Sequence, residues 1–397
     1  MTRARGVSIG HRVVGKVWFR VRLTDGRTDG RTIGCAFVQS TRMMTTMRSV
    51  VKGFVNSTTT TSTTTSSKNA RGRRGMGRRA TKTRAGVNSG FPAFFPPEVA
   101  ELTEPAAVEM AKRCAQVEVV VPGREKAVLT SCVGDKGPAG SDAPPFVLLH
   151  GFDSSCLEYR RLFPKLAAVT ETWAVDLLGW GFTDARDGGV GDYSPEAKRA
   201  HLYAFWKENI GRPMVLCGAS LGGAAAIDFA TNHPEAVEKL VLVDAQGFIE
   251  GLGPMGALPR PVAKMGVNIL RTVVLRNAAN QMAYFDKPTY ATEDALRVGR
   301  LHTFAPQWCD ATLSFMQSGG FKVRNSIPKV PVETLVMWGR DDKILEPSYA
   351  DKFMEELPNA KLVWVDECGH VAHLEQPDFM CETLLEFAQV GVGSTTN

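Results

Sequence analysis

The sequence predicts an α/β domain built on a mostly parallel β-sheet and preceded by a basic tail. Three observations lead to this fold class. From about residue 115 short β-branched runs alternate with helical patterns, the charge is unevenly divided along the chain, and the 397 residues have an ordinary globular composition, 44% hydrophobic and 22% charged. No run of about 18 apolar residues occurs, so a membrane-spanning helix is not expected.

The tail comprises residues 1–90 and is rich in Arg, Ser and Thr. Residues 1–97 carry a net charge of +17, whereas the other 300 residues carry −11. Such a segment cannot bury enough apolar surface to offset the entropy lost on ordering, so we expect it to be disordered. Its composition is typical of a transit peptide and predicts a chloroplast protein, at the stroma or the thylakoid surface, with the mitochondrion as the alternative.

Two further classes of partner are not expected. Arginines cluster near the end of the tail, but without interleaved aromatic residues or a recognisable nucleic-acid-binding fold, so no nucleic-acid partner is predicted. The eight cysteines form neither metal-type pairs nor a Cys-x-x-Cys motif. We therefore predict no metal and no other cofactor.

The domain is expected to contain eight strands, at residues 117–121, 127–132, 146–150, 172–176, 214–218, 240–244, 334–338 and 361–365. Helices are expected at residues 155–166, 195–209, 220–232, 348–357 and 378–389, the second of them capped by Ser194 with Pro195 in its first turn. Because helices separate most of the strands, they should cover both faces of the sheet. The core of the domain thus spans residues 115–248 and 329–390.

Residues 249–328 separate the sixth and seventh strands and are too many for a simple crossover. We interpret them as an inserted helical lid, since long insertions at the carboxyl edge of a parallel sheet lie where ligands bind. Its aromatic side chains, Phe304 and Trp308 among them, are expected to contact a large apolar substrate. The amphipathic, basic pattern of residues 262–276 predicts a helix with one apolar stripe. This stripe is expected either to cover the pocket or to make a peripheral contact with anionic membrane lipid.

The segment that carries the chemistry is Val-Leu-Cys-Gly-Ala-Ser-Leu-Gly-Gly at residues 215–223. An apolar strand leads into Gly218-x-Ser220-x-Gly222, and a helix-forming run of alanines follows. A serine on such a sharp turn is exposed to a base, and the crowded turn needs small residues two positions before and after it. Ser220 is therefore the predicted nucleophile.

With this turn and four further motifs, the chain resembles the α/β-hydrolase superfamily from about residue 115 to residue 390. The motifs are His150-Gly-Phe, Asp176-Leu-Leu-Gly-Trp-Gly, Trp338-Gly-Arg-Asp-Asp and Cys368-Gly-His, which follow the third, fourth, seventh and eighth strands. The resemblance implies the α/β-hydrolase fold with an eight-stranded sheet and a triad in the chain order Ser, Asp, His. The first two motifs are also similar to plastid α/β-hydrolases of plants and algae, such as chlorophyll dephytylase.

The resemblance implies that His370 is the base and Asp342 the acid that orients it. The spacing Gly-x-x-Asp from Gly339 selects Asp342 over Asp341, and Asp244 after the sixth strand is a further alternative. Backbone N–H groups of Phe152 and Leu221 are expected to form the oxyanion hole.

Other polar residues near these motifs are expected to have structural roles. His150 should shape its loop, and Asp176 should anchor the loop after its strand. Asp153 should cap the helix that follows it, with Ser154 or Ser155 as the alternative caps. His373 is interpreted as a surface or packing residue.

These residues predict a serine hydrolase that cleaves a small-molecule carboxylic ester through an acyl-enzyme. The aromatic lid favours a lipophilic substrate, such as a lipid or a phytyl or prenyl ester. Two alternatives stay open: the same triad acting on another bond, as in carbon–carbon bond hydrolases, amidases and cofactor-free haloperoxidases, or a ligand receptor on the hydrolase fold with little turnover. Epoxide hydrolases and dehalogenases are disfavoured because their nucleophile is Asp, and this turn has Ser220.

Overall fold

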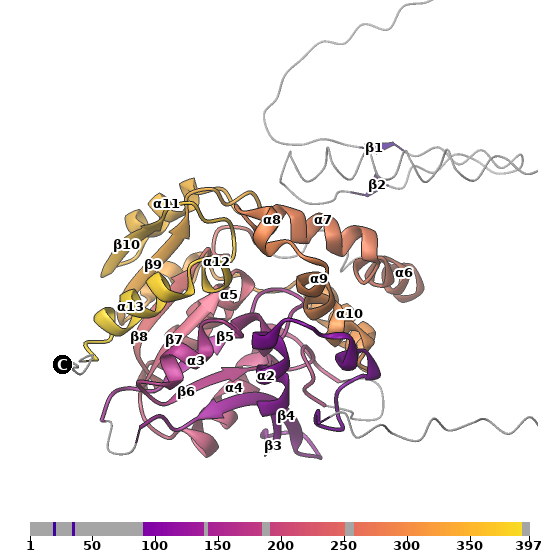
Figure 1. Cartoon of the computed structure of the whole chain (residues 1–397), viewed down its shortest axis with the longest axis horizontal. Coiled ribbons are helices and arrows are strands. Elements are labelled where there is room, and N and C mark those ends of the chain that lie inside the picture. Colours follow the sequence, from indigo (N-terminus) through magenta and orange to yellow (C-terminus); the bar gives the residue numbers. More distant parts are fainter. Residues whose placement is uncertain are drawn as a thin grey trace, which may run out of the picture.

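The computed structural model describes residues 19–20, 34–35, 90–138, 142–184, 191–250 and 258–390. Its centre is an eight-stranded sheet in the order β10-β9-β8-β7-β5-β6-β4-β3, with helices on both faces (Figure 1). All neighbours in this sheet pair in parallel except β4, which is antiparallel to both β3 and β6. The predicted α/β-hydrolase fold with a mostly parallel, eight-stranded sheet is confirmed.

Each predicted strand is present, with bounds shifted by at most a few residues. The strands are β3 (Ala115–Val119), β4 (Val128–Asp135), β5 (Phe146–Leu149), β6 (Thr172–Val175), β7 (Met214–Ala219), β8 (Val237–Val243), β9 (Glu333–Gly339) and β10 (Ala360–Val365). Every residue of β5 and β7 is buried, because helices cover both faces of the sheet there. Two-residue strands β1 (Phe19–Arg20) and β2 (Gly34–Cys35) pair with each other, and the rest of the predicted tail up to residue 89 lies outside the described residues.

Four of the five predicted core helices are present as α4 (Pro195–Asn209), α5 (Leu221–Asn232), α11 (Ser348–Glu356) and α13 (Pro377–Phe387). Ser194 caps α4 as predicted, since its hydroxyl accepts a hydrogen bond from the backbone of Ala197. The single helix predicted over 155–166 is wrong: the segment forms η2 (Cys156–Tyr159) and a separate helix α3 (Phe163–Ala167). Pro164 explains the break, because proline has no N–H to donate to a preceding turn and therefore stands at a helix start. Short turns η3 (Pro234–Ala236) and α12 (Ala372–Glu375) complete the core.

Two helices that the sequence analysis did not predict precede the sheet, η1 (Pro97–Glu101) and α2 (Pro105–Arg113). Phe95, Val99 and Met110 from this segment are buried in the same apolar cluster as the inner residues of β5 and β7. The backbone N–H groups of Thr103 and Glu104 also donate to the carboxylate of Asp294, at 3.0 and 2.6 Å. The folded domain therefore begins well before β3.

The insertion, residues 249–328, is helical where it is described. It contains α6 (Arg260–Leu270), α7 (Val273–Ala283), α8 (Lys287–Tyr290), α9 (Glu293–Leu301), η5 (His302–Phe304) and α10 (Trp308–Gln317), and η6 (Arg324–Lys329) leads back to the sheet. In Figure 1 α6 and α7 extend from the body of the domain at one side. Within the described ranges, no helix has both the length and the apolar character needed to cross a bilayer.

Removing the tail should leave stability unchanged, whereas removing the two preceding helices should not. A chain beginning at Asn88 keeps every described contact of the domain. A chain beginning at Ala115 loses the burial of Phe95, Val99 and Met110, each worth about 1.5–3 kcal/mol. Urea unfolding followed by circular dichroism measures the stability of the two shortened chains. Equal unfolding midpoints would contradict the packing described for η1 and α2.

Candidate active site

Ser220 lies on a sharp turn between the end of β7 and the start of α5. Its backbone has φ 52° and ψ −120°, a strained conformation for a residue with a side chain. A Cβ atom at Gly218 would lie 2.2 Å from the carbonyl oxygen of Gly222, and one at Gly222 would lie 2.3 Å from that of Leu149. Both glycines are therefore required for this turn, as the sequence pattern indicated.

The backbone of this turn is fixed to the neighbouring strand. The Ser220 N–H donates to the carbonyl of Val243 at 2.9 Å, and the Ser220 carbonyl accepts from the N–H of Gln246 at 2.8 Å. Ser220 therefore lies next to the end of β8, whose neighbour in the sheet is β9. The loops after β8 and β9 supply Asp244 and Asp342, the two candidate acids of the site.

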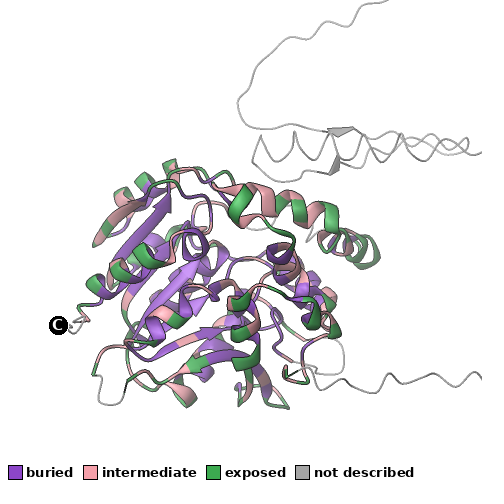
Figure 2. Cartoon of the chain, viewed as in Figure 1, coloured by how far each residue is buried: buried purple, intermediate pink, exposed green. Residues whose placement is uncertain are grey.

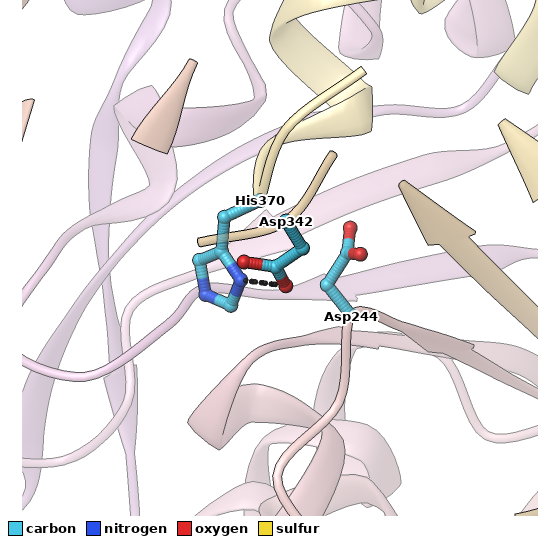
Figure 3. A group of neighbouring side chains, drawn as sticks. All are labelled: Asp244, Asp342 and His370. Atoms are coloured by element: carbon cyan, nitrogen blue, oxygen red, sulfur yellow. Dashed lines mark hydrogen bonds and ion pairs between the residues drawn. The ribbon is translucent and has the colours of Figure 1, made fainter. Parts of the chain in front are cut away.

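His370 and Asp342 form a hydrogen-bonded pair (Figure 3). The Nδ1 atom of His370 lies 2.7 Å from one carboxylate oxygen of Asp342, whose other oxygen accepts from the N–H groups of Ile344 and Leu345 at 2.7 and 3.0 Å. These donors hold an ionised carboxylate beside the ring and orient it. Asp342 faces His370 in this way and Asp341 does not. Among the described residues no hydrogen bond joins the Ser220 hydroxyl to His370.

Burial of the His370 ring opposes its protonation, but the charge of Asp342 and the hydrogen bond to it outweigh burial. The pKa of His370 is raised from 6.5 to about 9. A ring with a raised pKa is a stronger base for a proton taken from a neighbouring hydroxyl.

Asp244, the alternative acid, lies beside this pair without bonding the ring (Figure 3). One of its oxygens accepts from the N–H of Gly339 at 2.8 Å, and the other is buried with no partner in the described part of the chain. Burial, together with the charge of Asp342, raises the pKa of Asp244 well above its usual range. Both effects disfavour the charged form of the Asp244 carboxyl.

Asp244, Asp342 and His370 also have ligand-type atoms within 4.8 Å of one another, a spacing that could hold a metal ion. Their existing bonds argue for a different use. The Nδ1 atom of His370 and the facing oxygen of Asp342 are bonded to each other, and the raised pKa of Asp244 disfavours the deprotonated form that a metal ligand needs. The cluster fits a hydrogen-bonded acid and base better than a metal centre.

Two backbone donors lie unused close to Ser220. The N–H groups of Phe152 and Leu221 have no hydrogen-bond partner among the described residues. Leu221 opens α5, so the helix dipole adds to the attraction of its N–H for negative charge. Phe152 follows Gly151, where an added Cβ atom would lie 3.3 Å from the Ser220 Cβ. The predicted oxyanion donors therefore come from loops that adjoin Ser220.

His150 shapes the loop that carries Phe152. Its Nε2 atom accepts from the N–H of Leu177 at 3.1 Å, so Nδ1 holds the proton and donates to the Gly151 carbonyl at 2.8 Å. Asp176 anchors the following loop, since its carboxylate accepts from the N–H groups of Cys156 and Phe182 at 2.5 and 2.9 Å. Both residues have the structural roles predicted for them.

The geometry agrees with comparisons to known proteins. Residues 146–383, more than half of the chain, match the family model described as the alpha/beta hydrolase family. The chain belongs to the α/β-hydrolase family.

Individual members agree with this assignment. The chain is 40% identical over 315 residues to the alpha/beta hydrolase domain-containing protein VTE7 of Arabidopsis thaliana, covering 78% of this chain and 94% of that protein. It is 25% identical over 301 residues to an Arabidopsis thaliana protein named pheophytinase, chloroplastic, covering 60% of this chain and 59% of that protein. A solved serine hydrolase involved in carbazole degradation (CarC enzyme) matches with a TM-score of 0.55 and 25% identity, over 70% of this chain and 100% of that one. This α/β-hydrolase is an enzyme of the serine-hydrolase class.

One residue of this α/β-hydrolase was predicted wrongly. Asp153 does not cap the helix after it, because its φ of 51° turns its side chain away from that helix and toward the insertion. One carboxylate oxygen accepts from Trp308 Nε1 at 2.5 Å and lies 2.9 Å from His302 Nε2, and the other pairs with the guanidinium of Arg276. Burial opposes ionisation, but Arg276 and these hydrogen bonds lower the pKa of Asp153.

Asp153 therefore joins three parts of the insertion to the loop that carries Phe152. Arg276 lies on α7, His302 on η5 and Trp308 on α10, and Arg276 also donates to the backbone carbonyl of Asp153 at 3.0 Å. The sequence could not reveal this network, because the partners stand more than 120 positions from Asp153 and follow no local pattern.

The two predicted substrate-contacting residues of the insertion lie in different surroundings. Trp308 is 2% exposed and packs with Ala263, Val267 and Phe152, so it supports the oxyanion loop. Phe304 is 39% exposed, with the guanidinium of Arg300 lying 5.5 Å from its ring. A substitution of Trp308 would disturb the loop as well as any substrate contact.

The insertion also holds the loop of His370. The His370 N–H donates to the carbonyl of Ala283 at 2.7 Å, at the end of α7. Glu375, a residue that the sequence analysis did not single out, accepts from the N–H groups of Gly369 and Phe285 at 2.7 and 2.9 Å. Both sides of the site are thus bonded to the insertion.

His373 is a packing residue, as predicted. It is fully buried, its ring lies 4.9 Å from that of Tyr159, and its Nε2 atom lies 3.1 Å from a carboxylate oxygen of Glu158. The other oxygen of Glu158 accepts from the Gly151 N–H at 3.3 Å. Burial opposes ionisation of Glu158, but the neighbouring His373 side chain outweighs burial and lowers the pKa of Glu158 to about 2.

Replacing Asp153 by Asn should destabilise the enzyme by about 3 kcal/mol, because Arg276 is left as a largely buried cation without its anion. Asp310→Asn is the matched control. Asp310 also pairs with cations of the insertion, Arg260 and Lys264, but at the surface, so its loss should cost at most about 1 kcal/mol. Urea unfolding measures both changes, and equal losses would mean that Asp153 stabilises the insertion no more than a surface acid does.

Proposed function

We propose that this hydrolase cleaves a lipophilic carboxylic ester, with Ser220 as nucleophile, His370 as base and Asp342 as the acid that orients His370. The observation that carries the proposal is the strained turn at Ser220 beside two unpaired backbone N–H donors. Such a turn stores strain to expose a hydroxyl, and unpaired donors next to it stabilise an oxyanion.

The reaction begins when the Ser220 oxygen attacks the ester carbonyl and its proton passes to Nε2 of His370. Asp342 stabilises the resulting imidazolium, while the N–H groups of Phe152 and Leu221 bind the negative oxygen of the tetrahedral intermediate. The carbon–oxygen bond of the ester then breaks, and the departing alcohol takes the proton from His370. Water, deprotonated by the same ring, attacks the acyl-enzyme and releases the acid, which restores Ser220.

A lipophilic substrate, such as a lipid or a phytyl or prenyl ester, is supported by Trp308, which packs in one apolar cluster with Phe152, and by the half-exposed ring of Phe304. The relative named pheophytinase is consistent with a bulky apolar substrate. That relative is also named chloroplastic, and the acid-poor tail has transit-peptide composition, so we propose a plastid location with the mitochondrion as the alternative.

Ser220→Ala should abolish labelling by a fluorophosphonate probe and hydrolysis of short nitrophenyl esters, since only this serine is activated by a base. The same two proteins should then be incubated with plastid lipid and pigment extracts and analysed by mass spectrometry. Release of a long-chain or prenyl alcohol by the native enzyme alone supports the proposed function. Turnover of amides or carbon–carbon bonds instead would favour an alternative substrate class, and probe labelling without turnover would favour a receptor.

Asp342→Asn should lower kcat by about 10⁴-fold, because the amide leaves His370 in the wrong tautomer. Asp244→Asn is the matched control, since it keeps an oxygen to accept from Gly339 and removes a carboxyl that does not bond the His370 ring. It should reduce kcat less than about tenfold. Kinetics on a short nitrophenyl ester compare the variants, and the reverse order of losses would make Asp244 the acid.

The value of kcat/KM should rise with pH through the pKa of His370, because only the neutral ring can accept the Ser220 proton. The raised pKa of about 9 places this rise on the alkaline side of neutrality. Removing the charge of Asp342 lowers that pKa, so the residual activity of Asp342→Asn should rise at lower pH. An unshifted midpoint in this variant would show that Asp342 does not govern the ring.

A further inference from the structure

Exposed apolar side chains gather on the insertion. In the described part of the chain nine large hydrophobic residues are exposed, and all but Val120 and Phe379 belong to residues 249–328. Scattered exposed hydrophobic residues are normal, whereas a contiguous apolar surface marks an interaction site. Figure 2 shows that exposed and half-buried residues run along α6 and α7 where these helices extend from the domain.

Helix α6 is apolar over a wider arc than it buries. Ala263 and Val267 face α10 and are fully buried. Val262, Met265 and Ile269, spaced by three and four residues, form an adjacent stripe and are 47, 65 and 54% exposed. Val273 and Val274 extend the apolar surface into the first turn of α7, at 50 and 58% exposure. We call these five exposed residues the α6–α7 ridge.

The two helices that carry the ridge contain basic side chains and no acidic ones. Residues 260–285 contain four basic side chains and no Asp or Glu. Arg276 is bonded to Asp153, and Arg260 and Lys264 pair with Asp310 on α10. The remaining one, Arg271, lies in the turn between α6 and α7, between Ile269 and Val273 in sequence.

A second guanidinium lies next to this turn. Arg300 Nε donates to the carbonyl of Arg271 at 3.3 Å, and the guanidinium lies over the half-exposed ring of Phe304. The end of the ridge therefore combines two arginines with apolar side chains. Apolar side chains flanked by arginines suit the boundary between lipid acyl chains and anionic headgroups.

We propose that the α6–α7 ridge docks this enzyme on an anionic lipid bilayer, with the apolar side chains at the acyl boundary and Arg271 and Arg300 at the lipid phosphates. The reason for docking rests on the proposed function, since a lipophilic ester resides in a membrane. Arg276, within one turn of Val273 and Val274, bonds Asp153, which follows the predicted oxyanion donor Phe152, so the first turn of α7 lies close to a loop of the active site. A second copy of the chain fits the ridge less well, because two such faces would bring like-charged arginines together.

The test is hydrogen exchange on the full-length protein, with and without vesicles, read peptide by peptide by mass spectrometry. Peptide resolution is needed because the basic residues 1–89 can bind anionic vesicles on their own. Phosphatidylglycerol vesicles should protect residues 262–274, and phosphatidylcholine vesicles should protect them less. Protection confined to residues 1–89 would overturn the proposal. Protection of the ridge without lipid, at high protein concentration, would also overturn it and would indicate self-association instead.

Substitutions test whether lipid-dependent protection depends on the α6–α7 ridge or on exposed apolar residues elsewhere. Met265→Asp with Ile269→Asp should weaken the lipid-dependent protection of the insertion at least about tenfold, and Arg271→Glu with Arg300→Glu should weaken it selectively for phosphatidylglycerol. Val120→Asp with Phe379→Asp is the matched control, since both residues are exposed and apolar but lie elsewhere, and it should leave protection unchanged. Equal losses in ridge and control variants would overturn the proposal.

Turnover of short nitrophenyl esters distinguishes a failure of the proposed function from a failure of the proposed docking surface. It should be unchanged in all of these variants, because no substituted residue belongs to the catalytic machinery. Short-ester turnover without lipid-dependent protection would refute only the docking surface. Absent turnover in the native enzyme would refute the proposed function, and the exchange measurement would still decide whether the ridge binds lipid.

Discussion

The buried carboxylate of Asp153 holds the insertion and the oxyanion loop together. It is the common partner of a guanidinium, an imidazole and an indole N–H that come from three separate helical elements. Without it, the largely buried guanidinium of Arg276 would lose its anion, and the two buried rings would lose the carboxylate that bonds them, which costs several kcal/mol. The position of Phe152, next in sequence, therefore depends on how the insertion folds.

The other half of the site depends on strained or crowded backbone at the carboxyl ends of β7, β8 and β9. Ser220 and Asp244 both have positive φ, and each follows directly on a buried strand. The sheet compensates for this strain by fixing the turn through hydrogen bonds to neighbouring strands, such as that from Ser220 to Val243. A rigid sheet edge of this kind keeps an acid, a base and a hydroxyl in register across three loops.

The sequence was sufficient wherever the determining signal is local. Strands were found from their short β-branched runs, and the turn at Ser220 from glycines two positions away. Motif order and spacing predict that Asp342 pairs with His370. In the structure Asp342, and not Asp341, bonds the His370 ring. Failures arose where a distant partner decides the conformation: Asp153 bonds to residues far along the chain, and η1 and α2 are held by packing against the sheet.

The misreading of residues 155–166 has a different cause. Helical periodicity there predicts one continuous helix, but Pro164 lacks the N–H that would bond a preceding turn, so a separate helix begins beside it. The amphipathic pattern of α6 was recognised, yet only the fold shows that part of its apolar arc is buried against α10 and part is not. A periodic pattern gives the direction of an apolar face without revealing how much of it a neighbour covers.

Glu375 gives the enzyme a constraint on how its specificity can change. Through Gly369 and Phe285, its one carboxylate bonds both the loop of His370 and the chain that follows α7. Any displacement of α7 that admits a larger substrate is transmitted by these short bonds to the loop of His370. Selection on substrate size and selection on catalytic rate therefore act on the same few hydrogen bonds, so members of this family that diverge in the insertion must readjust the histidine loop at the same time.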